Sequence, residues 1–121
     1  MINETFIERH IKLGKKKAIT SKVLYSYYKI NGGKLKFSLF FRGLRRSIEE
    51  YRLKGNRIIG DEKGYYIAMT DEEWENYTAT VLRRIKTEIS VIASASNTTA
   101  GNIIKKLFPV DVNPSQINLD F

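Results

Sequence analysis

Apolar positions follow a helical period over most of the chain and a shorter period in one central stretch. Spacings of three and four residues predict helices in five segments: 3–13, 20–31, 38–54, 70–95 and 100–108. Between the third and the fourth, two short runs rich in Ile and Tyr, residues 57–60 and 64–69, flank the turn GDEKG and predict a two-stranded hairpin. The order of elements predicts an α+β fold that is mostly α.

The first two predicted helices each have a side that is expected to be buried. Those residues are Phe6, Ile7, Ile11 and Leu13 in the first helix, and Val23, Leu24, Tyr27 and Tyr28 in the second. Thr20 or Ser21 is expected to cap the second helix, because a hydroxyl oxygen there accepts a free backbone N–H of the first turn. Paired glycines after Asn31 are expected to end it in a flexible turn.

The third predicted helix, residues 38–54, carries two stripes on different faces. The apolar stripe is expected to be buried: Phe41, Leu44, Ile48 and Tyr51. The other stripe is largely cationic: Arg42, Arg45, Arg46 and Glu49. Ser38 is the expected N-cap, and Gly55 is expected to end the helix in the left-handed conformation.

The fourth predicted helix is long and begins with a capping box, since Thr70 precedes Glu73 by three residues. Its apolar stripe is regular: Trp74, Tyr77, Val81, Ile85, Ile89 and Ile92. The stripe spans about five helical turns, more than one small core is expected to cover. We therefore expect its C-terminal part to pack against a second copy of the chain in a homodimer.

Charge divides the chain into two unlike halves. Residues 1–69 hold 16 Lys and Arg against 6 Asp and Glu, a net charge of +10, whereas residues 70–121 hold 5 against 7, a net charge of −2. The N-terminal half is therefore expected to face a polyanion. A membrane partner is not expected, because surface-binding helices place Trp, Phe or Leu opposite their basic residues and the single Trp lies in the acidic half.

Several classes of protein lack their characteristic residues in this sequence. There is no cysteine for disulfides, thiol catalysis or thiolate ligands, and His10 is the only histidine. No catalytic triad, phosphate-binding glycine loop or paired metal-binding motif is present. We expect a cytoplasmic protein that is not an enzyme and uses no cofactor or metal, since the N-terminus also lacks a signal peptide.

The segment Ile19 to Met69 resembles the winged helix-turn-helix domains of small bacteriophage and prophage proteins. The resemblance rests on AITSKVL at the second helix and on LRRSIEEYRLKGNRIIGDEKGYYIAMTDEEWENY from the third helix through the hairpin and beyond. The hairpin is also similar, more loosely, to that of the N-terminal domain of biotin-ligase repressors. The resemblance to winged helix-turn-helix domains implies a double-stranded DNA-binding protein that acts in transcriptional regulation or replication. Its third helix is expected to enter the major groove, and its hairpin is the wing.

The candidate DNA-binding residues follow from this arrangement. They are Arg42, Arg45, Arg46, Lys36, Ser38, Arg57, Lys63, Lys15, Lys16 and Lys17. Arg42 and Arg46 lie one turn apart on a single line and are assigned to the groove. Arg45 is rotated toward a groove wall and is assigned to phosphate, and Lys63 lies at the tip of the wing.

One alternative keeps the fold and changes the partner, because the basic face of a winged-helix scaffold can also bind an acidic protein, as in an inhibitor.

The expected organisation is a winged-helix domain over 1–69, a packing or dimerisation helix over 70–95, and a short helix with an extended tail over 96–121. The tail VDVNPSQINLDF alternates apolar and polar residues, so it can add a strand to a partner protein, pack across a dimer or remain a partly disordered end.

Overall fold

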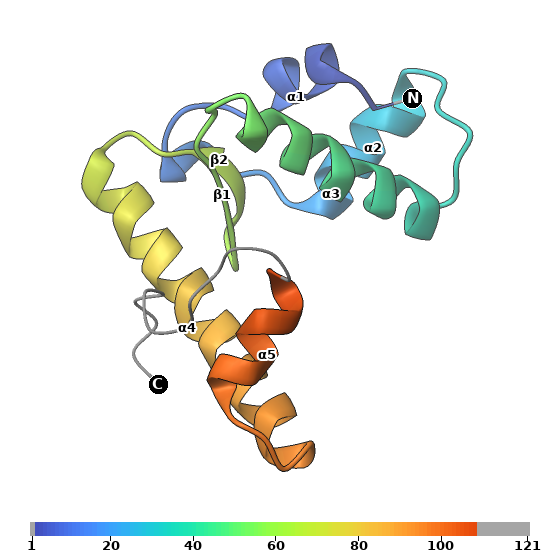
Figure 1. The fold of residues 1–121 in the computed structure, drawn as a ribbon. Helices are drawn as coiled ribbons and strands as arrows, with labels where there is room; N and C mark the ends of the chain where they lie inside the picture. Colours follow the sequence, from blue (N-terminus) through green and yellow to red (C-terminus); the bar gives the residue numbers. More distant parts are fainter. Residues whose placement is uncertain (1, 109–121) are drawn as a thin grey trace. The chain divides into compact units, whose positions relative to one another are not determined.

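The computed structural model describes residues 2–108, which form a mostly helical α+β fold with one two-stranded antiparallel sheet (Figure 1). The elements are α1 (Glu4–His10), the 3-10 turn η1 (Lys15–Lys17), α2 (Ser21–Ile30), α3 (Phe37–Leu53), β1 (Ile58–Asp61), β2 (Gly64–Ile67), α4 (Asp71–Ala95) and α5 (Ala100–Leu107). The chain forms two compact units, residues 1–75 and 76–121. The division falls within α4 and not at its start.

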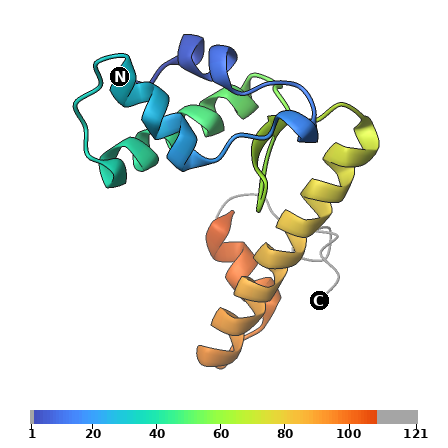
Figure 2. The ribbon, with the colours of Figure 1, turned by 180° about the vertical axis from the view of Figure 1, so that it is seen from behind.

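The core of the first unit lies among α1, α2, α3 and the hairpin. Its buried residues include Ile7, Ile11, Leu24, Tyr28, Phe40, Leu44, Ile48 and Ile58. Figures 1 and 2 show α1 and α2 alongside α3 from opposite sides. Thr20 caps α2 as predicted, since its Oγ1 accepts the Val23 N–H at 3.3 Å.

The buried stripe of α3 begins one residue earlier than predicted, at Phe40 and not at Phe41. Phe40 is fully buried and Phe41 only half-buried, because the inward line is Phe40, Leu44 and Ile48, spaced four residues apart. The Phe40 ring lies 4.8 Å from that of Tyr28 and 5.2 Å from that of Tyr25, between ring centroids. In α2, Leu24 and Tyr28 are buried as expected.

Expectations for four other side chains near these helices were also wrong. Val23 and Tyr27 are exposed on α2, and Leu13 is exposed beyond α1. Ser38 does not cap α3, which begins at Phe37 after Lys36 and has no side-chain cap. Gly55 does follow α3 with a φ of +95°, the left-handed conformation that glycine adopts without strain.

The hairpin pairs β1 with β2 in the register Ile58 to Ile67 through Asp61 to Gly64. Glu62 and Lys63 form its tip, where Asp61 Oδ1 accepts the Lys63 backbone N–H at 2.8 Å. Tyr66 is buried and donates its hydroxyl hydrogen to Asp61 Oδ2 at 3.0 Å. Burial and this hydrogen bond raise the pKa of Tyr66 to about 12.

The other edge of β2 is paired as well, with the segment that follows α1. Ile19 and Tyr65 exchange two backbone hydrogen bonds of 3.0 and 2.8 Å, and the Ile67 N–H donates to Lys12 O at 2.8 Å. This pairing explains why α1 ends at His10 and not at residue 13. A Cβ on Gly64 would lie 2.5 Å from the Ile19 carbonyl carbon, so only glycine permits this close approach.

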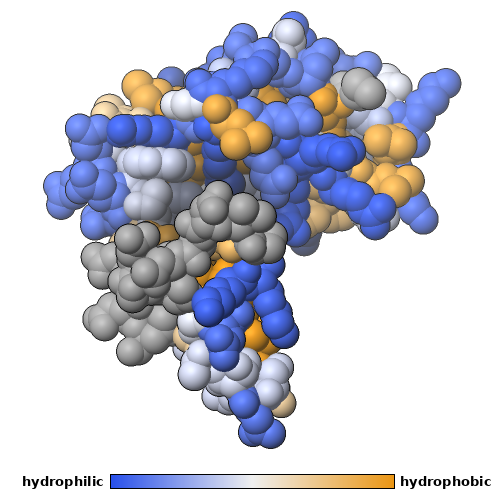
Figure 3. All heavy atoms as spheres, in the orientation of Figure 1, coloured by the Kyte–Doolittle hydropathy of each residue, from blue (hydrophilic) through white to orange (hydrophobic). Residues whose placement is uncertain are grey.

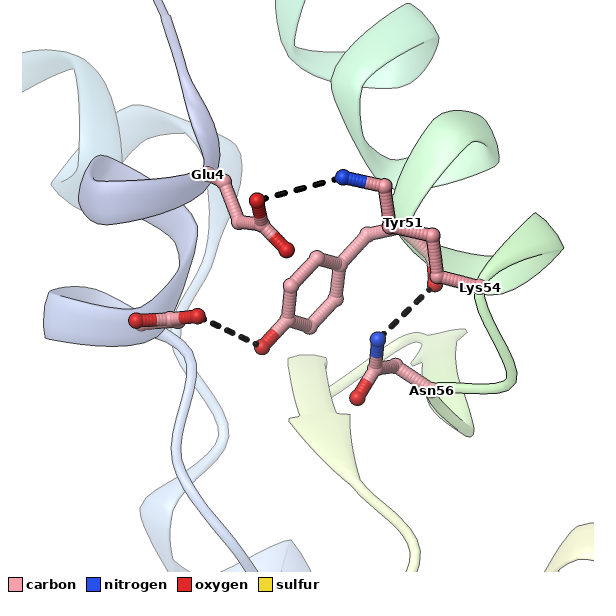
Figure 4. Close-up of polar contacts among 5 residues, drawn as sticks. Glu4, Tyr51, Lys54 and Asn56 are labelled. Atoms are coloured by element: carbon pink, nitrogen blue, oxygen red, sulfur yellow. Dashed lines mark hydrogen bonds and ion pairs between the residues drawn. The ribbon is translucent and has the colours of Figure 1, made fainter.

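Polar contacts join α1 to the C-terminal end of α3 (Figure 4). Lys54 Nζ lies 3.2 Å from Glu4 Oε2, and the Tyr51 hydroxyl donates to Glu8 Oε1 at 3.4 Å. The Asn56 side chain donates to the Tyr51 carbonyl at 3.0 Å. Partial burial and the neighbouring Glu8 raise the pKa of Tyr51. Tyr51 is therefore half-buried in this contact and not part of the deepest core.

His10 packs between aromatic rings at the end of α1. Its ring stacks on that of Tyr27 at 4.7 Å and lies 4.6 Å from that of Phe6. Its Nε2 is buried and has no hydrogen-bond partner among the described residues. Burial, with the neighbouring Arg9 and Lys12, lowers the pKa of His10. Protonation of His10 therefore favours the unfolded chain. The free energy of unfolding has its full value above about pH 6.5, the pKa of an ordinary histidine, and decreases as the pH falls from there through the lowered pKa of His10 in the folded protein.

The second unit is a helical pair. Ile89 and Ala93 of α4 pack against Ile103 and Ile104 of α5. Within the C-terminal part of the α4 stripe, Ile89 is thus covered by the same chain, which weakens the reason given above for a second copy there. Of the remaining stripe residues, Trp74, Tyr77 and Val81 are half-buried, whereas Ile85 and Ile92 are exposed. The homodimer stays a prediction, and the tail over 109–121 lies outside the described residues.

Candidate nucleic-acid interface

Arg42 and Arg46 lie on the face of α3 opposite its buried residues. With about 100° between successive residues, each lies about 160° from Leu44, on either side of the outward direction. Arg45 lies about 100° from Leu44, on the flank of α3 that also carries Phe41. All three arginines are exposed. The helix therefore presents them to solvent because Phe40, Leu44 and Ile48 fix its other face in the core.

The three arginines line one shallow concavity of about 580 Å³. Its other lining residues are Ser38, Phe41 and Glu49. None of the three arginine side chains forms an ion pair or a hydrogen bond with another residue in the range 2–108. Their donors therefore face solvent and are available to an anionic partner.

Phe41 holds one arginine in place. The Arg45 guanidinium carbon lies 5.9 Å from the centroid of the Phe41 ring, within the range of a cation–π contact. The Phe41 ring in turn stacks on that of Phe37 at 5.8 Å, with 5° between the ring planes. The sequence prediction placed Phe41 in the buried stripe; in the structure it is half-buried, packed against the core and also lining the concavity with the arginines.

The hairpin lies near the C-terminal end of α3 (Figure 1). It is joined to α3 by Arg52, whose Nε donates to Ile58 O at 2.9 Å. Arg52 follows Arg45 by seven residues, so both lie on one flank of the helix. Arg45 therefore shares its flank with the attachment point of the hairpin. The sequence prediction missed Arg52, although its spacing from Arg45 already placed it on that flank.

The remaining candidate residues lie outside the concavity. Lys63 is exposed at the tip of the hairpin, and Lys36 is exposed just before α3. Lys15, Lys16 and Lys17 form the exposed turn η1, at the edge of β2 that faces away from β1. Arg57 forms a short ion pair with Asp71 at the base of the hairpin, so part of its charge is neutralised within the chain.

Hydrophilic side chains cover much of the face of the first unit that Figure 3 shows, and separate apolar patches interrupt them. Leu39 and Phe37, at the start of α3, are 42% and 37% exposed. Leu39 precedes Arg42 by three residues and Arg46 by seven, so it continues their line along the helix. The cationic face therefore has an apolar end.

No family model matches the chain, and comparisons with curated proteins and with solved structures found no match either. Among the helices of residues 2–108, none combines the length and the apolar character needed to cross a membrane. Nowhere in the same range do three or more His, Asp or Glu side chains gather as a metal ion would require.

Proposed function

We propose that the first unit is a winged helix-turn-helix module that binds double-stranded DNA, with α3 in the major groove and the hairpin as its wing. One observation carries the proposal. Arg42, Arg45 and Arg46 gather without ion-pair partners on the outward side of α3, and the hairpin is attached on the Arg45 flank of the same helix. A net charge of +10 over residues 1–69 supports a polyanionic ligand.

The three arginines suit two kinds of contact with the duplex. The outward line of Arg42 and Arg46 favours the groove floor, where a guanidinium can donate two hydrogen bonds to guanine O6 and N7. Arg45 lies on the flank and is held against Phe41, which favours a phosphate at the groove wall. Lys63, at the hairpin tip, is assigned to the sugar-phosphate backbone of the DNA beside that groove. A role in phage or mobile-element transcription or replication rests on the resemblance of the sequence alone.

An acidic protein is the second candidate partner. The exposed Leu39 and Phe37 favour it, because readers of DNA often place polar side chains at the start of the recognition helix. The aromatic rings and arginines of α3 also match the residues that protein interfaces enrich. This partner would occupy the same face of α3, so the two candidates exclude each other there.

Fluorescence anisotropy with three labelled probes tests the choice: random duplex DNA, single-stranded DNA of the same length, and an acidic polypeptide. The expected result is tightest binding to the duplex, weakening steeply as salt is raised because bound phosphates release counterions. Tighter binding to the acidic polypeptide would reject the DNA proposal in favour of the protein partner. Tighter binding to the single strand would reject the duplex as the ligand.

A further inference from the structure

We propose that Arg52 is a positioning residue, which holds the hairpin against α3 so that Lys63 reaches the same duplex as the three arginines. This inference rests on the proposed function, since it concerns how the wing meets DNA. It does not make Arg52 a DNA contact. Arg52 is only partly exposed and directs its Nε into the protein.

The acceptor of Arg52 is a carbonyl that the sheet leaves unpaired. The Ala68 N–H donates to Arg57 O, so the backbone N–H and C=O of Arg57 face the strand that contains β2. In an antiparallel pair the next residue turns its N–H and C=O the other way. The Ile58 carbonyl therefore points away from β2, toward α3, and Arg52 satisfies it at 2.9 Å. The contact closes the free edge of β1 with a side chain of the helix.

The space beside Gly60, two residues farther along β1, is occupied by neighbouring side chains. A Cβ on Gly60 would be 2.9 Å from the Tyr65 ring and 3.9 Å from Arg52 Nη2. The absence of a side chain at Gly60 thus lets Tyr65 and the guanidinium approach the strand. Arg52 is therefore hydrogen-bonded to β1 at Ile58, and its guanidinium extends along the strand toward Gly60, where a side chain would meet it.

The direction of β1 matters because the tip is distant from its attachment. With about 3.3 Å per residue, Lys63 lies roughly 13 Å beyond Ile58, so a tilt of about 15° would move it by about 3 Å. A shift of that size separates an ammonium from a phosphate oxygen at hydrogen-bond distance. The β2 edge is held by the segment around Ile19. On the β1 side, Ile58 is buried in the core with residues of α3, and Arg52 adds the hydrogen bond that ties the outer edge of the strand to the helix.

A double-mutant cycle tests the coupling, with the salt slope of duplex binding as the readout. In the wild-type background, Lys63→Ala should reduce the slope by about one, as expected for one lost phosphate contact. In the Arg52→Gln background, Lys63→Ala should leave the salt slope unchanged, because the hairpin tip no longer reaches the phosphate backbone of the DNA. Arg52→Lys keeps the charge but loses the Nε donor, and it should uncouple Lys63 in the same way.

Lys54→Gln is the matched control. It removes one positive charge from the end of α3, but Lys54 pairs with Glu4 of α1 and not with the hairpin. In that background Lys63→Ala should keep its full effect. An equal effect of Lys63→Ala in the wild-type, Arg52→Gln and Arg52→Lys backgrounds would overturn the role of Arg52. No effect of Lys63→Ala in any background, with binding still dependent on Arg42, Arg45 and Arg46, would overturn the wing contact and leave the proposed function standing.

Discussion

Replacing Arg42, Arg45 and Arg46 together by alanine should weaken binding to duplex DNA by about a hundredfold or more without unfolding the protein. Two bidentate contacts to guanine are worth roughly 1 to 3 kcal/mol each, and the loss of a phosphate contact adds to this. The fold should persist because the three side chains are exposed, while the buried line of Phe40, Leu44 and Ile48 is untouched. Anisotropy with random and selected duplexes measures the affinity, and circular dichroism checks the fold.

The matched control removes the same charge from the second unit by replacing Arg83, Arg84 and Lys105 with alanine. All three are exposed in that unit. This variant should keep binding much closer to wild type, since general charge attraction accounts for only part of the affinity. If the α3 variant binds within twofold of wild type while its fold is preserved, α3 is not the DNA-binding element.

Replacing Phe40 by alanine should lower the free energy of unfolding by about 3 to 5 kcal/mol, the usual range for a buried Phe in a well-packed core. Phe40 is fully buried, and its ring contacts Phe6, Tyr25 and Tyr28. Since small domains are stable by only about 5 to 15 kcal/mol, the variant should unfold at a much lower urea concentration.

Phe41→Ala is the control for Phe40→Ala. Phe41 is half-buried beside Arg45, so its loss should cost clearly less stability and should instead weaken DNA binding by releasing the Arg45 guanidinium. Urea denaturation of the two variants under identical conditions gives the comparison. An equal or larger loss of stability in Phe41→Ala would contradict the packing of α3 described above.

Local sequence patterns predicted the elements well because helix periods, caps and turn residues are local properties. The Thr20 and Thr70 caps, the hairpin and the left-handed Gly55 all lie where the sequence placed them. The phase of α3 was harder to predict, because the run LFF offers successive apolar residues. Only packing against Tyr25 and Tyr28 selects Phe40 as the buried member.

The errors concern contacts between residues distant in sequence. No local pattern shows that residues 12–19 pair with β2, and that pairing ends α1 at His10. Likewise, the apolar stripe of α4 shows that something covers Ile89, but not that α5 does so. Among the candidate site residues, the periodicity of α3 grouped the three arginines, whereas the pairing of Arg57 with Asp71 depends on the hairpin's geometry.

The most direct test of the central claim is the backbone amide NMR spectrum of the whole chain during titration with duplex DNA. The expected perturbations lie in α3, over residues 38–49, and at the hairpin tip, over residues 61–64, while the amides of α5 keep their positions. That pattern would place the duplex on the arginine face and the wing together. A saturated complex in which the α3 amides stay unshifted, or in which the perturbations gather in α4 and α5, would contradict DNA binding by α3.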